Sequence, residues 1–177
     1  LTAWGKGSYR RRDNSFVPML IDGTNLEGRA LQDGPVGLNV AEACPAGPQY
    51  FWAYCIAYHA TGNEFMWAMV RDIALGNSLG DVGETPTDTP KLQMDTPCSQ
   101  VYCLLGFLEL YAKTKKVEFL QTARRIGDNI LAGGFYRGFF VPSDKHVYAR
   151  FDCSEPLALL HLDAAVKPAS QSIPAVW

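Results

Sequence analysis

The feature that most constrains the fold of this chain is an internal repeat with a period of 53 to 54 residues. At an offset of 53, the matching pairs are Tyr54 with Phe107, Ala57 with Leu110, Tyr58 with Tyr111, and Thr61 with Thr114. At an offset of 54, they are Glu64 with Glu118, Phe65 with Phe119, and Arg71 with Arg125. A period of this length indicates that one supersecondary unit is repeated along the chain.

Each copy is predicted to be a helical hairpin, which consists of a helix, a tight turn and a second helix. Apolar residues recur at helical spacing, and residues that break helices follow each run. The predicted helices span residues 49–60, 64–75, 99–113 and 116–132, and a third first helix begins at 154 and stops before 167–168. The expected N-cap residues are Asn63, Ser99 and Ser154.

The two helices of a hairpin differ in their apolar pattern. The first helix is apolar on nearly all sides, whereas the second carries Arg124, Arg125 and Asp128 on the same helix as Phe119 and Ile126. These patterns are typical of an inner and an outer layer of helices. We therefore expect an all-α fold of the α/α-toroid class in preference to an open solenoid.

The length of the chain predicts only part of such a ring. A closed toroid of six or seven hairpins needs about 300 residues or more at this period, and the chain has 177. We expect an N-terminal loop segment (1–48), hairpin repeats (49–166) and a C-terminal tail (167–177). The remainder of the toroid would come from the same parent chain or from a second chain, and the exposed apolar helix flanks should cause self-association.

Connection lengths predict which face carries the function. Turns within a hairpin are short, whereas residues 77–98 and 133–153 form long connections that lead back to the start of a first helix. Long connections without a function are uncommon in compact domains. We expect these connections and the N-terminal segment to gather on one face, where helix N-termini favour anionic ligands.

The second long connection is predicted to form a β-hairpin near residues 138–151, with strands at 139–141 and 146–150 around a turn at 142–145. Alternation places His146, Tyr148 and Arg150 on one side of the second strand, with Lys145 in the turn. These side chains can accept a proton, donate one and bind a carboxylate. The alternative is an ordinary solvated strand face.

Two further groups are candidate binding residues. Arg10, Arg11 and Arg12 are consecutive, which suggests bidentate recognition of carboxylate or phosphate, although a charged loop would look the same. Tyr50 and Trp52 lie at the mouth of the first inner helix and can stack on a sugar ring, with the alternative that they are core aromatics.

The composition of the chain argues against several classes of partner and of stabilising bond. The net charge of −2 and the lack of a long apolar run argue against nucleic acid and membrane partners. The five cysteines form no CxxC pair, so we expect structural thiols and no disulfide framework. The acidic residues Asp81, Glu84, Asp88 and Asp95 can supply oxygen ligands for calcium, but their Thr-Pro repeats are equally typical of a stiff connector. The sequence names no metal ligands.

Several stretches resemble bacterial pectate lyases and related polysaccharide lyases built on α/α toroids. These are YRRRDNSFVPMLIDGTNLEG (9–28), TGNEFMW (61–67), GFLELYAKTKKVEFLQTARRIGDNIL (106–131) and GFFVPSDKHVYARFD (138–152). The RRRDN and KHVYAR segments are the parts that resemble a lyase and not only a toroid. The resemblance implies a secreted or periplasmic protein with an acidic polysaccharide as its substrate.

The resemblance also implies β-elimination on a uronic-acid polymer, most simply pectate or polygalacturonate. That reaction needs a neutralised carboxylate, a base for the C5 proton and a proton for the leaving oxygen. Arg10 and Arg12 suit the first role, and Tyr148, His146 or Lys145 the others, with Arg150 available as clamp or base. The resemblance further implies a divalent cation such as Ca²⁺.

Two other functions fit the same helices. A glycoside hydrolase would need two carboxylates beside the scissile bond, for which Asp13, Asp22 and Glu27 are available. A non-catalytic carbohydrate-binding fragment would keep the helices without a catalytic group.

Overall fold

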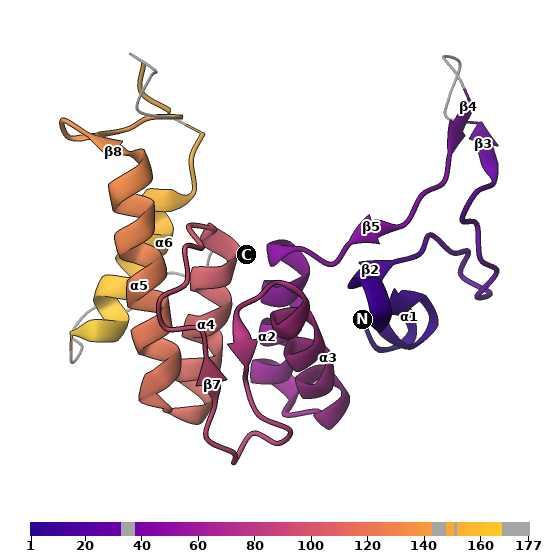
Figure 1. Ribbon diagram of the computed structural model, residues 1–177, viewed down its shortest axis with the longest axis horizontal. Coiled ribbons are helices and arrows are strands. Elements are labelled where there is room, and N and C mark those ends of the chain that lie inside the picture. The colour runs from indigo at the N-terminus through magenta and orange to yellow at the C-terminus, as the bar shows by residue number, and fades with distance from the viewer. Residues whose placement is uncertain (33–37, 143–147, 151, 168–177) are drawn as a thin grey trace.

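The protein is a set of helical hairpins with small antiparallel sheets in its connections (Figure 1). The computed structural model describes residues 1–32, 38–142, 148–150 and 152–167. The helices are α1 (Thr2–Ser8), α2 (Pro48–Thr61), α3 (Glu64–Gly76), α4 (Val101–Thr114), α5 (Val117–Gly134) and α6 (Glu155–Val166), with a 3₁₀ turn η1 (Arg11–Asp13). The predicted all-α class is confirmed, and the predicted helices agree with α2 to α6 within two residues at their ends.

The turns between paired helices form as the sequence predicts. Helix α2 ends at Gly62, which has a positive φ of 66°. The Asn63 carboxamide oxygen then accepts hydrogen bonds from the backbone N–H groups of Phe65 and Met66, so Asn63 caps α3 as expected. The prediction that Ser99 caps α4 is wrong, because the helix begins at Val101 and Gln100 is its N-cap residue. Ser154 occupies the N-cap position of α6 but makes no capping hydrogen bond with its side chain.

The helices form two layers, as in an α/α toroid. The first helices α2, α4 and α6 pack in sequence order, and the second helices α3 and α5 cover α2 and α4 from the other side. Helix α4 is buried on most of its surface, whereas α5 buries one stripe that includes Phe119, Ile126 and Ile130. The difference between an apolar first helix and an amphipathic second helix therefore follows from their place in the inner or outer layer.

The core joins the two hairpins through aromatic rings. Phe51 of α2 packs against Phe107 of α4 with ring centroids 5.1 Å apart, and Phe107 lies 6.2 Å from Phe119 of α5. All three side chains are fully buried. Gly106 allows this approach, because a Cβ atom there would lie 2.6 Å from Cε1 of Phe51.

The first long connection does not stay on the predicted functional face. It contains β6 (Gly80–Asp81) and β7 (Lys91–Leu92), and its middle part lies between the outer helices α3 and α5 (Figure 1). Trp67 of α3 donates from Nε1 to the Gly83 carbonyl at 3.0 Å. From the other side, Asn129 of α5 donates to the Thr96 and Cys98 carbonyls, each at 2.8 Å. Leu79 and Val82 of the connection are buried, so this segment is part of the core.

The N-terminal segment forms a separate flank of the molecule. Helix α1 packs beside α3, and three short strands pair in the order β1, β2, β5. These strands are β1 (Tyr9–Arg10), β2 (Ser15–Phe16) and β5 (Cys44–Pro45). A two-stranded arm, β3 (Ala30–Gln32) with β4 (Leu38–Val40), extends away from the helices (Figure 1).

The second long connection forms a hairpin in a different register from the predicted one. The strand Phe139–Phe140 (β9) pairs with Phe135–Tyr136 (β8) across a turn at Arg137 and Gly138. Both turn residues have positive φ values, 50° and 90°, as a two-residue type I′ hairpin turn requires. The predicted partner strand is absent at residues 148–150, while positions 143–147 lie outside the described residues.

A substitution at Gly106 should test the contact between α2 and α4. We expect Gly106→Ala to lower the free energy of unfolding by about 1–3 kcal/mol, because the new Cβ would lie 2.6 Å from the ring of the fully buried Phe51. Gly133→Ala is the matched control in α5, where a Cβ meets nothing within 4 Å. The control should unfold at the same or a slightly higher urea concentration, since alanine favours helix. Equal stability of both variants would contradict the proposed packing.

The exposed leucines of α6 should make the chain self-associate. Leu157 and Leu160 are 37% and 55% exposed, whereas their repeat equivalents Leu104 and Phe107 are fully buried. We expect light scattering to show association that is reduced when Leu157 and Leu160 are both changed to Gln. Leu75→Gln, on an exposed leucine of α3, should leave the association unchanged.

Candidate functional site

A cleft of about 370 Å³ opens where α4 and α6 begin and α5 ends. Its walls come from three helices and the two long connections that precede α4 and α6, so it lies on the face where the sequence predicts a functional site. The lining residues are Ser99, Gln100, Val101, Tyr102, Asn129, Ile130, Gly133, Gly134, Phe140, Val141, Pro142, Arg150, Ser154 and Glu155. Most of them are polar or expose backbone groups, which suits a hydroxyl-rich ligand.

Arg150 is the only cationic side chain among these lining residues. Its backbone N–H donates to the Phe140 carbonyl at 2.8 Å, which attaches the end of the connection to β9. The guanidinium lies 3.4 Å from a carboxylate oxygen of Glu155 and 3.8 Å from one of Asp152. The side chain is 36% exposed, so the same guanidinium remains accessible to a carboxylate that enters the cleft.

Glu155 is one of the residues of this cleft that the sequence analysis did not single out. It occupies the first position of α6, where an acidic side chain is stabilised by the helix dipole. One carboxylate oxygen accepts from Arg150, while the other is buried without a protein hydrogen-bond donor. The sequence Ser154-Glu155-Pro156 marks the start of a helix. An acidic residue at such a position usually stabilises the helix and has no role in ligand binding, so the sequence offered no reason to select Glu155.

Of the other three predicted catalytic residues, the structure describes the position of only one. Tyr148 is 59% exposed and lies two residues before Arg150, close to the cleft in sequence. Lys145 and His146 lie outside the described residues. The predicted side-by-side arrangement of His146, Tyr148 and Arg150 on one strand therefore remains a prediction for His146, and no strand forms at Tyr148 or Arg150.

Trp52 connects α2 to the cleft through an aromatic pair. Its ring lies 5.3 Å from that of Tyr102, with 32° between the ring planes. Tyr102 lines the cleft, and both residues are half-buried near the start of their inner helices. The predicted stacking platform at Trp52 thus has a second aromatic residue that the sequence analysis did not single out.

Tyr50 has mainly a packing role in the N-terminal flank. Its ring contacts Trp4 and Phe16 at centroid distances of 5.3 and 4.7 Å. Its hydroxyl lies 3.2 Å from the Cys44 sulfur, and this hydrogen bond, with partial burial, raises the pKa of Tyr50 to about 12. These contacts are those expected of a core aromatic residue, which was the alternative to a sugar-stacking role for Tyr50.

The three consecutive arginines have different partners. Arg10 bridges Asp13 and Glu27, with distances of 2.8 and 2.9 Å. Arg11 reaches Asp72 of α3 at 3.0 Å, which attaches the N-terminal flank to the outer helix. Arg12 has only a 4.0 Å contact with Asp13 among the described ion pairs, and its side chain is 80% exposed. Of the three, Arg12 is the most available to an external anion.

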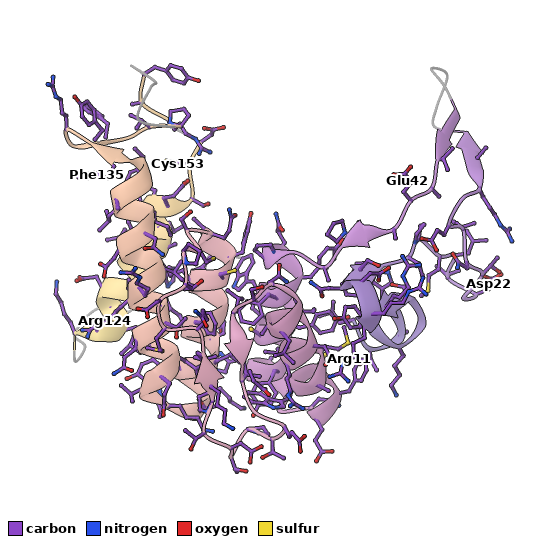
Figure 2. The ribbon with its side chains drawn as sticks, viewed as in Figure 1. Arg11, Asp22, Glu42, Arg124, Phe135 and Cys153 are labelled. Carbon is purple, nitrogen blue, oxygen red and sulfur yellow. The ribbon has the colours of Figure 1, made fainter. Side chains whose placement is uncertain are left out.

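The structure does not bring the arginine cluster and the Arg150 cleft together. Figure 2 shows Arg11 beside the N-terminal flank and Cys153, which adjoins the cleft residue Ser154, on the opposite side of the helices. A single sugar residue therefore cannot contact both groups. An extended polymer that crosses the face between them would be needed to use both.

The described residues do not form a complete cation site. No group of three or more His, Cys, Asp or Glu side chains in the described ranges is arranged to hold a metal ion. Asp81, one of the predicted calcium ligands, is instead paired with Arg71 at 2.8 Å, which lowers its pKa to about 2. Asp88 accepts from the backbone N–H of Thr85 and acts as a turn residue. A divalent cation remains a prediction from the resemblance.

The chain is thus a set of helical hairpins with a polar, arginine-containing cleft at the N-termini of its inner helices. A family model described as periplasmic pectate lyase matches residues 1–177, so the chain belongs to this family of polysaccharide lyases. The resemblance inferred from the sequence is confirmed. The expected secreted or periplasmic localisation agrees with the description of the family as periplasmic. Among the described helices, none is long and apolar enough to cross a membrane.

The arginine cluster allows a test of which arginine stabilises the fold and which one is available to bind a ligand. Arg10→Ala should lower the urea midpoint of unfolding, because it leaves Asp13 and Glu27 without their shared cation. Arg12→Ala removes the same charge from an exposed side chain whose described ion-pair contact, with Asp13, is 4.0 Å long, and it should leave the midpoint nearly unchanged. A loss of stability in the Arg12 variant as large as that in the Arg10 variant would contradict these assignments.

Proposed function

We propose that this protein acts in the cleavage of pectate or polygalacturonate by β-elimination, with the Arg150 cleft as the site that holds a uronate residue. The single observation that supports it most is the position of the Arg150 guanidinium in a polar cleft at the N-termini of two inner helices. The family of the chain adds that the ligand is an acidic polysaccharide.

The reaction makes specific demands on the site. A base removes the proton at C5, a double bond forms between C4 and C5, and the bond between C4 and the glycosidic oxygen breaks. The departing oxygen then takes a proton. The carboxylate on C5 must be neutralised, because the negative charge that develops at C5 spreads onto its oxygens.

Arg150 suits the neutralisation of that carboxylate. A guanidinium offers two parallel N–H donors, which match the two oxygens of a carboxylate. To bind substrate, it would exchange its 3.4 Å contact with Glu155 for the uronate. The exposed N–H groups at the starts of α4 and α6 add positive potential on the same side of the cleft.

Proton transfer falls to the residues just before Arg150 in the chain. Tyr148 is exposed on this segment, and His146 and Lys145 precede it. A phenol, an imidazole or an amine can each exchange a proton with a sugar carbon or oxygen once it is positioned there. Arg150 itself is the alternative base, although a guanidinium keeps its proton more strongly than any of these groups.

The other predicted binding residues of the protein are available to contact further sugar units of the same polymer. The Trp52 and Tyr102 rings can stack on a pyranose ring beside the cleft. Arg12, with its exposed side chain, can bind a distant uronate carboxylate as the polymer extends toward the N-terminal flank. A bound divalent cation would supply additional positive charge for carboxylates.

Ultraviolet absorption distinguishes this function from its alternatives. The C4–C5 double bond is conjugated with the carboxylate and absorbs in the near ultraviolet. We expect the protein to generate this signal from polygalacturonate, in assays with calcium and with a chelator. Arg150→Ala or Tyr148→Phe should reduce kcat/KM by about 100-fold or more, if each acts on the transition state. Arg12→Ala should raise KM more than it lowers kcat, because a remote clamp binds ground and transition states alike.

Matched controls lie in the same connection. Arg137→Ala removes a guanidinium that packs on Tyr136 outside the cleft, and Tyr136→Phe removes a hydroxyl from an exposed tyrosine. Both controls should keep the parental rate. Reducing ends released without the chromophore would assign the protein to the hydrolases. Binding of polygalacturonate without either product would leave a carbohydrate-binding protein.

A further inference from the structure

We propose that Phe135 forms a sugar-binding platform beside the Arg150 cleft, on which the next galacturonate ring of a bound polymer stacks. Such a subsite rests on the proposed function, because it assumes that a uronate residue occupies that cleft. Phe135 itself is outside the set of lining residues. It belongs to the β8–β9 hairpin, whose exposed aromatic residues have no role in the reaction as derived above.

Phe135 continues the wall of the cleft outward. It pairs with Phe140 in the hairpin, so the two side chains lie on the same face, and their ring centroids are 5.2 Å apart. Phe140 lines the cleft, and Phe135 directly follows the lining residue Gly134. Figure 2 shows Phe135 at the end of α5, on the same side of the helices as Cys153. Because Phe135 is 46% exposed, its ring is open to a ligand that extends beyond the cleft.

The other exposed rings of the hairpin lie on its opposite face. Tyr136 pairs with Phe139, so these two side chains alternate with those of Phe135 and Phe140 and point away from the cleft. Phe139 is 61% exposed, and the Arg137 guanidinium lies 5.1 Å from the centroid of the Tyr136 ring. Phe135 is therefore the exposed aromatic residue of this hairpin that is continuous with the cleft.

The Phe135 platform and Arg150 are attached to the same strand. The Phe140 carbonyl accepts a hydrogen bond from the backbone N–H of Arg150 at 2.8 Å. The next residue, Val141, is buried, and its N–H donates to the Gly134 carbonyl at 2.9 Å. Hydrogen bonds thus hold the backbone that carries both side chains. Phe135 and Arg150 can therefore bind one polymer without a rearrangement of the backbone at these positions.

A galacturonate ring has a face that suits a phenyl group. In the galacto configuration the hydroxyl on C4 is axial, so the C–H bonds at C3, C4 and C5 form an apolar patch on the opposite face of the ring. A phenyl ring that packs on this patch gains dispersion contacts and removes apolar surface from water. Few torsion angles set the position of an aromatic ring, so little conformational entropy is lost. The carboxylate and hydroxyl groups at the edge of the sugar remain in solvent.

The subsite adds a second aromatic position to the one at Trp52. Tyr102, which contacts Trp52, lines the cleft from α4, whereas Phe140 lines it from β9. A polymer whose carboxylate binds Arg150 thus has aromatic rings available on two walls of the cleft, and Phe135 extends the second wall. Each further sugar unit that stacks adds binding energy, so the affinity should rise with the length of the oligomer.

The test measures dissociation constants for saturated oligogalacturonates, from the monomer to the hexamer, by isothermal titration calorimetry. All measurements use the protein with Tyr148→Phe, in which turnover should be slow enough to leave the ligand intact. Phe135→Ala should weaken the binding of the hexamer by about 3- to 10-fold, as expected for the loss of one stacked ring. It should leave unchanged the binding of the shortest oligomer that binds, because that ligand occupies only the cleft.

Phe139→Ala is the matched control. It removes the same type of side chain from the same hairpin, on the face that points away from the cleft. This variant should bind oligomers of every length as tightly as the protein with Phe139. Phe135→Tyr keeps the aromatic ring and should retain the affinity for the hexamer. The Tm of each variant, together with the binding of the shortest oligomer, shows whether the hairpin and the cleft are intact.

Several results would overturn the platform. With Phe135→Ala, an unchanged affinity for the hexamer would do so and would leave the lyase function standing. An equal loss for short and long oligomers would show that Phe135 only supports the cleft wall through Phe140. Reduced self-association in light scattering, with hexamer affinity unchanged, would make the ring a contact between protein chains.

The binding measurements also separate this subsite from the reaction. Binding that depends on Phe135 and on oligomer length, without an ultraviolet signal from the protein that retains Tyr148, would support the platform and contradict the lyase function. If no oligomer bound to the protein, both the platform and the proposed function would fall.

Discussion

The close packing of α2 against α4 is the contact on which the rest of the structure depends. Phe51 and Cys55 of α2 reach α4 at Gly106, where a side chain of any size would interfere. Phe107 continues the contact to Phe119 and so joins the inner layer to the outer one. Because both inner helices are held side by side, the connections at their N-termini are brought to the same face. The cleft beside Arg150 lies at the next junction of this inner layer, where α4 and α6 begin and α5 ends.

The helices could be predicted from the sequence because residues close to each helix end determine where that helix begins and stops. Apolar spacing, the Asn63 cap and the glycine at position 62 act within a few residues, and the structure places α2 to α6 accordingly. The hairpin in the second connection was misplaced for a physical reason. Pro142 to Lys145 looked like the turn, whereas the chain turns at Arg137 and Gly138, where an arginine adopts a positive φ that its type rarely favours.

The candidate site was predictable in its residue types but not in its partners. Arg150 was singled out by charge and alternation, and it does line a cleft. Glu155 was not, because its position in a Ser-Glu-Pro helix start is also what a purely structural residue would occupy. Asn129 was not, because it donates to the Thr96 and Cys98 carbonyls, which are distant in sequence and meet it only in the folded chain. The same limit applies to the arginine run, since nothing local distinguishes Arg10, which bridges Asp13 and Glu27, from the exposed Arg12. The sequence identifies a cluster of charged residues. Only the tertiary structure shows which of these residues already form ion pairs within the protein.

The segment between α3 and α5 has a geometric consequence for how the two hairpins lie relative to each other. The inner helices α2 and α4 touch directly, whereas their outer partners are separated by buried residues of the connection, including Leu79 and Val82. A spacer on the outer side and direct contact on the inner side make two neighbouring hairpins diverge outward, so that the stack bends toward its inner layer. The buried residues of the connection thus fill space in the outer layer that direct helix contact fills in the inner layer. A change in the volume of these residues should alter the angle between the two hairpins without altering the sequence of any helix.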